Sequence, residues 1–431
     1  METTHWGGPG EDYRLSKISA AAISEDNGIG APAPDDAAPV WQPPKAIHSF
    51  PWFEMVMTVI GVLGVIGLTL YMLTPAATGN FALVKTTLLA LIPLVIVVGF
   101  LIRIDRWEPE PWKTKIAVFL WGAGVATLSS GILNTALHYN IAYSTGDVQG
   151  ASALSATFVA PLVEETLKAV GVLIVVLARR TSINSVLDGV VYAGFSAAGF
   201  MFTEDILYFL RGEAEGTANL IIVVVMRGVF SPFLHVMATS MTGIGLALAL
   251  LKFKRGWSKT GIVIVFWVCA MGIHFLWNGS ASYGGGWFLI LYAVVQVPAF
   301  ILWSVLLLRA TRKEAEKIRT GLVPYVRTGW VLPGEVTMAT DKRSRKAALK
   351  WAARGGRDSK KAMRSFLANL ASLGLDQRLM AKHGPDPARI ENDRQMLTDA
   401  ADNRREFLRL TSIADQQHDV SKAVSSHARA A

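Results

Sequence analysis

The sequence predicts an all-α protein, a polytopic transmembrane helix bundle of about eight spans with a C-terminal cytoplasmic helical extension. Two observations lead to this fold class. The chain has 431 residues, of which 52% are hydrophobic, and its long apolar runs are confined to residues 51–310. Many of these runs approach the ~20 residues that a helix needs to cross a bilayer. The flanking segments, 1–50 and 311–431, are polar.

The apolar runs define the predicted spans. The sixth run is too long for one straight crossing, and Arg227 and Pro232 interrupt it. We therefore expect a short or re-entrant helix followed by a full span, with the break covered by protein or water. The predicted spans are about 54–74, 82–104, 115–137, 158–178, 186–210, 219–251, 260–280 and 286–308.

The two polar ends differ in pattern. Residues 1–50 are rich in Pro, Gly, Ala and Asp, which predicts a disordered segment. Residues 311–431 are basic and place apolar residues at helical spacing in 341–354, 360–374 and 388–410. This spacing predicts a small helical tail.

The distribution of Lys and Arg predicts the orientation. Basic residues gather after the second, fourth, sixth and eighth spans, whereas the 3–4 and 7–8 loops contain none. Cytoplasmic loops carry the excess of positive charge, so both termini are expected in the cytoplasm of a multi-pass cell-membrane protein. The net charge of +9 is interpreted as loop and tail charge near the anionic lipid bilayer, not as a nucleic-acid-binding surface.

Ionisable residues inside the spans share one predicted depth. Glu164 and Glu165 lie in the fourth span, Glu204 in the fifth, His235 in the sixth and His274 in the seventh. From the helical rise, each lies roughly 10 Å below the outer surface. Charged groups in hydrocarbon are costly and are usually functional. We therefore expect one site near the extracytoplasmic side.

The residue types at this depth suit hydrolysis. Lys168 follows Glu164 by one turn, and Asn278 follows His274 by one turn. A glutamate can act as general base toward water while His and Asn donate to an oxyanion. Alternatively, His235, His274 and Glu204 can hold zinc with one open position. These residues alone do not distinguish general-base catalysis from zinc-dependent catalysis. The single cysteine, Cys269, excludes a cysteine metal cluster.

In order along the chain, these motifs resemble the PrsW family of intramembrane metalloproteases or glutamic-type proteases. That family is related to the CAAX prenyl endopeptidases and a bacteriocin-processing group. The resemblance covers about residues 50–310. The matching motifs are Asp105-Arg-Trp-Glu108-Pro-Glu110-Pro-Trp112, Glu164-Glu165-x-x-Lys168, Phe200-x-x-x-Glu204, Arg227-Gly-Val-Phe-Ser-Pro-Phe-Leu-His235 and His274-x-x-x-Asn278.

The resemblance implies that residues 51–310 form a protease domain. Its substrates would be single-span membrane proteins, notably anti-sigma factors, cut near the extracytoplasmic side. Glu164 and Glu165 would activate water, and His235, His274 and Asn278 would bind metal or the oxyanion. The broader group often has histidine where Glu204 stands, so the ligand set stays open.

The sequence also allows two other functions. A proton-coupled membrane transporter can also use acids and histidines at one depth as a relay. Such transporters often show repeated halves with a midplane site, and we find no repeat in this sequence. A non-enzymatic scaffold acting through the basic tail would leave the polar layer unexplained.

Overall fold

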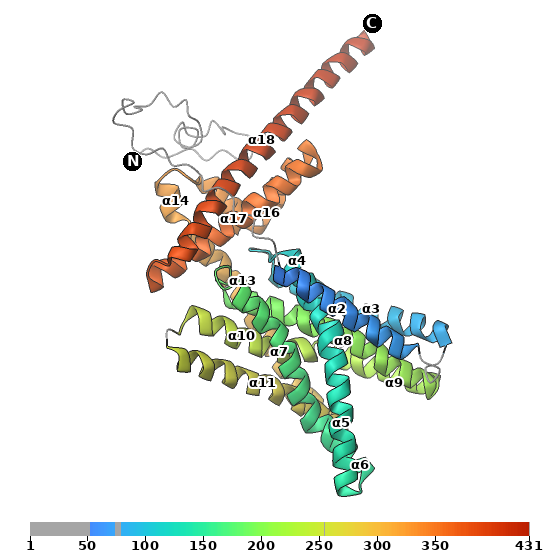
Figure 1. The fold of residues 1–431 in the computed structure, drawn as a ribbon. Coiled ribbons are helices and arrows are strands. Elements are labelled where there is room, and N and C mark those ends of the chain that lie inside the picture. Colours follow the sequence, from blue (N-terminus) through green and yellow to red (C-terminus); the bar gives the residue numbers. More distant parts are fainter. Residues whose placement is uncertain (1–51, 74–78, 254, 431) are drawn as a thin grey trace. The chain divides into compact units, whose positions relative to one another are not determined.

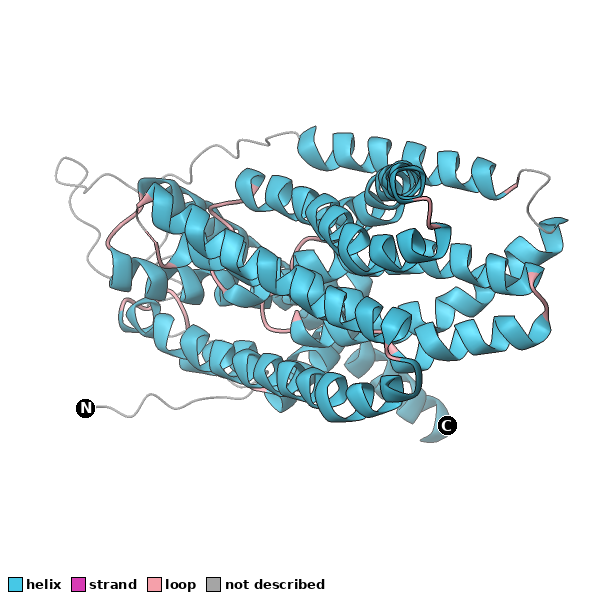
Figure 2. Ribbon diagram, turned by 90° about the horizontal axis from the view of Figure 1, so that it is seen from below, coloured by secondary structure: helices cyan, strands magenta, loops and turns pink. Residues whose placement is uncertain are grey.

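The structure is a computed structural model, and it describes residues 52–73, 79–253 and 255–430. The segment predicted to be disordered, 1–50, lies outside the described residues. Those residues form helices and connecting loops, without strands (Figure 2). The chain divides into two compact units, one of which covers Ser49–Thr311 and the other of which contains everything from Arg312 onward. We refer to them as the membrane unit and the C-terminal unit.

The membrane unit is built from helices joined by short turns. Its α-helices are Trp52–Met72 (α2), Gly79–Ile104 (α3), Trp112–Leu120 (α4), Thr127–Thr145 (α5), Val148–Leu154 (α6), Ala160–Ala178 (α7), Val186–Ala214 (α8), Thr217–Val225 (α9), Leu234–Leu251 (α10), Gly256–Tyr283 (α11), Phe288–Leu291 (α12) and Val297–Gly321 (α13), the last of which extends into the C-terminal unit. Four π-helical turns, Trp121–Ala126 (η1), Ser155–Val159 (η2), Met226–Phe230 (η3) and Tyr292–Gln296 (η5), and one 3-10 turn, Gly285–Trp287 (η4), interrupt or join them.

Seven helical segments among the described residues are long and apolar enough to cross a membrane. The predicted polytopic helix bundle is therefore confirmed. The fourth predicted span corresponds to α7, which is not one of the seven. Its 19 residues include Glu164, Glu165 and Lys168, so it carries more charge in its apolar stretch than any of the seven. An α-helix of 19 residues is nevertheless about as long as a bilayer core is thick.

Helix α8 is the centre of the membrane unit. It packs against α3, α7, α9 and α10 (Figure 1), and 89% of its apolar window is buried. Its start is fixed by a capping box in which the Ser185 hydroxyl accepts from Leu187 N while the Asp188 carboxylate accepts from Ser185 N. Capping satisfies amides that have no partner within the helix. This central position places Glu204 inside the bundle.

Helices α8 and α10 approach closely at two glycines. A Cβ atom at Gly243 would lie 2.1 Å from the carbonyl oxygen of Gly189, and one at Gly189 would lie 2.2 Å from that of Gly243. No larger residue fits either position without a shift of the backbone. Small residues at helix crossings are typical of membrane bundles. This contact sets the distance between the helices that carry Glu204 and His235.

The sixth predicted span is broken, as expected from Pro232. Helix α9 continues into the π-helical turn η3, the chain unwinds over Ser231–Phe233, and α10 begins at Leu234. π-helical turns are often found at functional sites. The break lies directly before His235 and directly after the turn that carries Arg227.

The motif that begins at Asp105 forms a buried polar cluster. Lys115 Nζ lies 2.6 Å from Asp105 Oδ2, and the Tyr192 hydroxyl donates to Glu110. Asn184 donates to Glu108 at 2.7 Å. These contacts connect the loop before α4 to α8 and to the loop before α8. The motif therefore stabilises the bundle. These contacts do not involve the ionisable residues of the predicted site.

The C-terminal unit is also helical. It contains Val323–Arg327 (α14), Pro333–Thr340 (α15), Lys342–Ala352 (α16), Gly356–His383 (α17) and Pro387–Ala430 (α18), with a 3-10 turn at Ala353–Gly355 (η6). Helices α17 and α18 lie side by side (Figure 1). Phe366 and Phe407 pack at their interface with ring centroids 5.5 Å apart, and Arg404 pairs with the buried Glu335 at 2.5 Å.

Candidate functional site

Four helices bring the predicted ionisable residues together. Glu164 and Glu165 come from α7, Glu204 from α8, His235 from α10 and His274 from α11. The two imidazole rings lie 5.0 Å apart and perpendicular to each other. His235 Nε2 is 2.9 Å from Glu204 Oε2, and His274 Nδ1 is 3.0 Å from Glu165 Oε1. The structure thus forms one cluster from residues that span more than a hundred positions of sequence.

Glu165 is fully buried, and its carboxylate makes three contacts. Lys168 Nζ lies 2.5 Å from Oε1, the Thr239 hydroxyl donates to Oε2 at 2.7 Å, and His274 Nδ1 contacts Oε1. A buried carboxylate is stable when such partners surround it. Because a carboxylate only accepts hydrogen bonds, this contact fixes the His274 proton on Nδ1 and leaves Nε2 as an acceptor.

Lys168 connects the acid pair to the other histidine. Its side chain is fully buried, and Nζ lies 3.1 Å from His235 Nδ1 and 4.3 Å from the centre of the Phe200 ring. An ammonium group only donates. Its contact with Nδ1 therefore assigns the His235 proton to Nε2, from which it points to Glu204.

Arg227 pairs with two acids of α8. Its guanidinium pairs with Glu204 and lies 2.5 Å from Asp205 Oδ1, and it stacks 4.4 Å above the Tyr208 ring. The segment around the helix break thus supplies both a cation and, at His235, an imidazole.

Glu164 differs from Glu165 in having one carboxylate oxygen without a partner. Oε1 accepts from Asn134 Nδ2 at 3.2 Å. Oε2 is buried and has no hydrogen-bond partner among the described residues, and it lies 3.8 Å from His274 Nε2. A buried polar atom without a partner costs about 1–3 kcal/mol, so this oxygen marks a position where a ligand would be stabilised.

A polar cavity reaches this carboxylate. It has a volume of about 460 Å³ and is lined by Glu164 and Glu204 together with residues of α5, α6 and α8. Ligand-binding cavities commonly have volumes of this order, about 300–1,000 Å³. Hydroxyl and amide side chains make up much of the α5 and α6 walls. The cavity can therefore hold water or a polar segment next to Glu164.

Three side chains of the cluster lie close enough to hold a divalent metal ion, provided that His235 gives up its contact with Lys168 or Glu204 and so frees a ring nitrogen. Ligand atoms of Glu164, His235 and His274 all lie within 4.8 Å of one another. Two imidazoles and one carboxylate are a common donor set for zinc. The sequence had placed Glu204 in this set, whereas the structure brings Glu164 into it and pairs Glu204 with Arg227. The Nδ1 contact of His274 with a carboxylate is also typical of metal-binding histidines.

The last predicted site residue, Asn278, contacts the backbone. Its Nδ2 donates to the carbonyl oxygen of Ala156 at 2.8 Å. The contact ties α11 to the π-helical turn η2, one turn beyond His274. The geometry assigns Asn278 to holding these two segments together.

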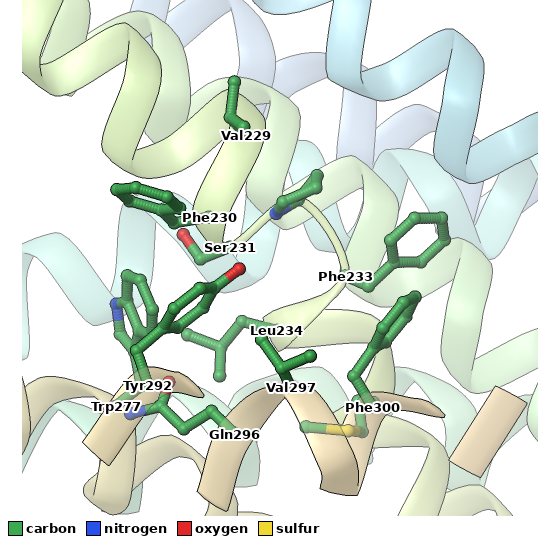
Figure 3. A pocket seen from close by; sticks show the side chains of 12 residues that line it. Val229, Phe230, Ser231, Phe233, Leu234, Trp277, Tyr292, Gln296, Val297 and Phe300 are labelled. Carbon is green, nitrogen blue, oxygen red and sulfur yellow. The ribbon is translucent and has the colours of Figure 1, made fainter. Parts of the chain in front are cut away.

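An apolar cavity lies beside the break between η3 and α10. Phe233 and Phe300 meet there with ring centroids 5.1 Å apart, and Phe230 and Tyr292 meet at 5.0 Å. Figure 3 shows these rings around Leu234, the residue that precedes His235. The packing holds the unwound segment in place and so fixes the start of α10.

Two contacts of the cluster were not predicted from the sequence. Asn134 and Thr239 each bond one carboxylate of the acid pair. Both are uncharged polar residues on long apolar helices, where such residues commonly bond their own backbone. Thr239 follows His235 by one turn of α10, and this spacing is the one signal in the sequence that could have indicated it.

Comparisons with known proteins agree with the motif pattern. Residues 110–303 match the family described as PrsW family intramembrane metalloprotease. Over 150 residues the chain is 31% identical to Protease PrsW of Clostridioides difficile (strain 630), which covers 35% of this chain and 60% of that relative. The match thus spans less than two thirds of the relative's length. No solved structure matches the chain. The resemblance to the PrsW family that was inferred from the motifs is thus confirmed over residues 110–303.

Proposed function

We propose that this protein is an intramembrane endopeptidase that hydrolyses peptide bonds of single-span membrane proteins, anti-sigma factors among them. The observation that carries the proposal is the unpaired Oε2 of Glu164, buried beside His274 Nε2 and the polar cavity. Hydrolysis inside a membrane needs a place where water meets a basic group. The match to the family model supports the same reaction.

The two adjacent acids have separate roles in this proposal. Glu165 is held by three partners and positions His274. Glu164 faces the cavity and either takes a proton from water or binds a metal ion, and both roles use its free oxygen. A zinc ion held by Glu164, His235 and His274 would supply Lewis-acid activation of water.

Charge near the cluster would support the developing oxyanion. Lys168 is a fully buried cation and Arg227 a partly buried one, and the partners of both are acids of the site. Preorganised donors of this kind stabilise negative charge in the transition state. Lys168 and Glu204 act here by holding His235, which each of them contacts.

The basic loops support an orientation with both termini in the cytoplasm. In this orientation the cavity lies toward the extracytoplasmic side, where the cleavage would occur. The predicted domain limits, 51–310 for the protease domain and 311–431 for the basic cytoplasmic tail, are part of the same proposal.

The test is cleavage by the purified full chain in lipid vesicles that contain a panel of single-span proteins. We expect fragments cut near one membrane boundary with the wild type, and none with His274→Ala. A zinc chelator should stop cleavage if the metal scheme holds. Absence of cleavage together with proton-gradient-dependent uptake of a solute would instead support the transporter function.

A further inference from the structure

One wall of the polar cavity has no role in the proposed reaction. It is formed by α5, α6 and η2 and carries uncharged hydrogen-bonding side chains, namely Thr127, Ser130, Asn134, Ser152 and Ser155. The acids Glu164 and Glu204 line the same cavity, as do His138 and Arg211. The uncharged groups of the α5, α6 and η2 wall suit an uncharged ligand that carries both donors and acceptors.

Asn134 is held in one orientation. Its Nδ2 donates to Glu164 Oε1 at 3.2 Å, and while Glu164 is ionised the amide oxygen cannot take this position, because a carboxylate has no proton to donate. Oδ1 therefore points away from Glu164. It is buried and has no hydrogen-bond partner among the described residues. The amide thus presents a fixed acceptor next to the acid.

Ser155 provides a second unpaired group on this wall. The residue is 8% exposed, and its hydroxyl has no partner among the described residues. It lies in the π-helical turn η2, which packs against α5, α7 and α11. By contrast, the hydroxyls of Thr127 and Ser130 donate to carbonyl oxygens of their own segment. Two buried polar groups without partners in one cavity point to a ligand that pairs with both.

A peptide backbone has the required chemistry. In a membrane helix every N–H and C=O group is paired internally, and unwinding frees these groups in a region without bulk water. On the basis of the proposed function, we propose that Asn134 and Ser155 form a binding site for the unwound backbone of the substrate. Asn134 Oδ1 accepts from a peptide N–H, and Ser155 Oγ bonds a neighbouring backbone group. The same amide joins the substrate to Glu164, so one residue sets the distance between them.

The test measures binding separately from cleavage. The probe is a synthetic peptide with one leucine-rich span of about 20 residues and a Gly-Pro pair near one end. Its dissociation constant is measured in lipid nanodiscs on the full chain carrying His274→Ala, so that no hydrolysis occurs. One neutral hydrogen bond is worth about 0.5–1.5 kcal/mol, so Asn134→Ala and Ser155→Ala should each weaken binding about 2- to 13-fold. Asn140→Ala is the matched control, because Asn140 is exposed on the same helix.

A second measurement identifies the backbone group. Replacing one peptide bond at a time by an ester removes a single N–H. At one position, the ester should weaken binding to the parent protein, which carries His274→Ala alone. The same ester should have no further effect on the protein that also carries Asn134→Ala. Equal binding by the parent and both alanine variants would overturn the proposal, as would an ester effect unchanged by Asn134→Ala or no binding of the probe to the parent. If the probe binds in this Asn134-dependent way and the wild type does not cleave it, the endopeptidase proposal fails while the binding site stands.

Discussion

The buried pair of Lys168 and Glu165 allows a quantitative test of how the site is held. Both side chains are fully buried, and Nζ and Oε1 are 2.5 Å apart. At an effective dielectric constant of about 20, their attraction is about 7 kcal/mol. Much of this attraction is offset by the cost of removing both charges from water. The substitution Lys168→Met, however, leaves Glu165 buried without its cation. Such a change typically destabilises a protein by about 3–5 kcal/mol.

The double variant Glu165→Gln/Lys168→Met removes both charges. We expect it to be at least about 2 kcal/mol more stable than the sum of the two single variants predicts, because neither charge is left alone. The free energy of unfolding is measured by denaturant titration in mixed micelles, followed by tryptophan fluorescence.

A partly exposed ion pair in the same unit provides the control. Lys85 and Glu213 are 2.8 Å apart, and their side chains are 35% and 24% exposed. Because solvent screens this pair, the same cycle should give a coupling energy of about 1 kcal/mol or less. A coupling energy at Glu165 and Lys168 no larger than that of the control would refute the reasoning.

Two further changes test other parts of the fold. Gly243→Ala should destabilise the membrane unit by roughly 1–3 kcal/mol, because its Cβ would meet the Gly189 carbonyl at 2.1 Å, whereas Gly261→Ala, with no neighbour within 4 Å, should not lower the thermal unfolding temperature. In the C-terminal unit, burial, together with the nearby Asp376 carboxylate, raises the pKa of Asp393 to about 8. The folded state then binds more protons than the unfolded state between about pH 4 and 8, so stability falls as pH rises through this range, by up to about 1.4 kcal/mol per pH unit. Asp393→Asn should remove most of this loss in calorimetry of the full chain, and an unchanged pH dependence would contradict the assignment.

The sequence was sufficient to predict the cluster because charges are rare in apolar spans. Glu164, Glu204, His235 and His274 stood out against hydrocarbon-compatible neighbours, and equal depth followed from the helical rise. The break in the sixth span was predictable from Pro232 for a similar reason, since proline removes a backbone donor.

The pairings within the cluster could not be predicted in the same way. They depend on the rotation of each helix about its axis, which one sequence does not give. The sequence grouped Glu204 with the histidines, and Glu204 does contact His235, but its additional pairing with Arg227 could not be predicted. The role of Asn134 could not be predicted either, because an uncharged residue in an apolar helix gives no indication of a functional contact. The catalytic roles of the seven predicted site residues remain predictions.

The central claim is that the free carboxylate of Glu164 is the reactive group of the site. The most direct measurement is the initial rate at which Glu164→Gln cleaves a single-span substrate in vesicles, with Glu215→Gln, an exposed loop acid, as the matched control. General acid–base catalysis contributes roughly 10²- to 10⁴-fold, so we expect a loss of at least 10²-fold for Glu164→Gln and a wild-type rate for Glu215→Gln. A Glu164→Gln protein that is folded and cleaves within tenfold of the wild-type rate would contradict the claim.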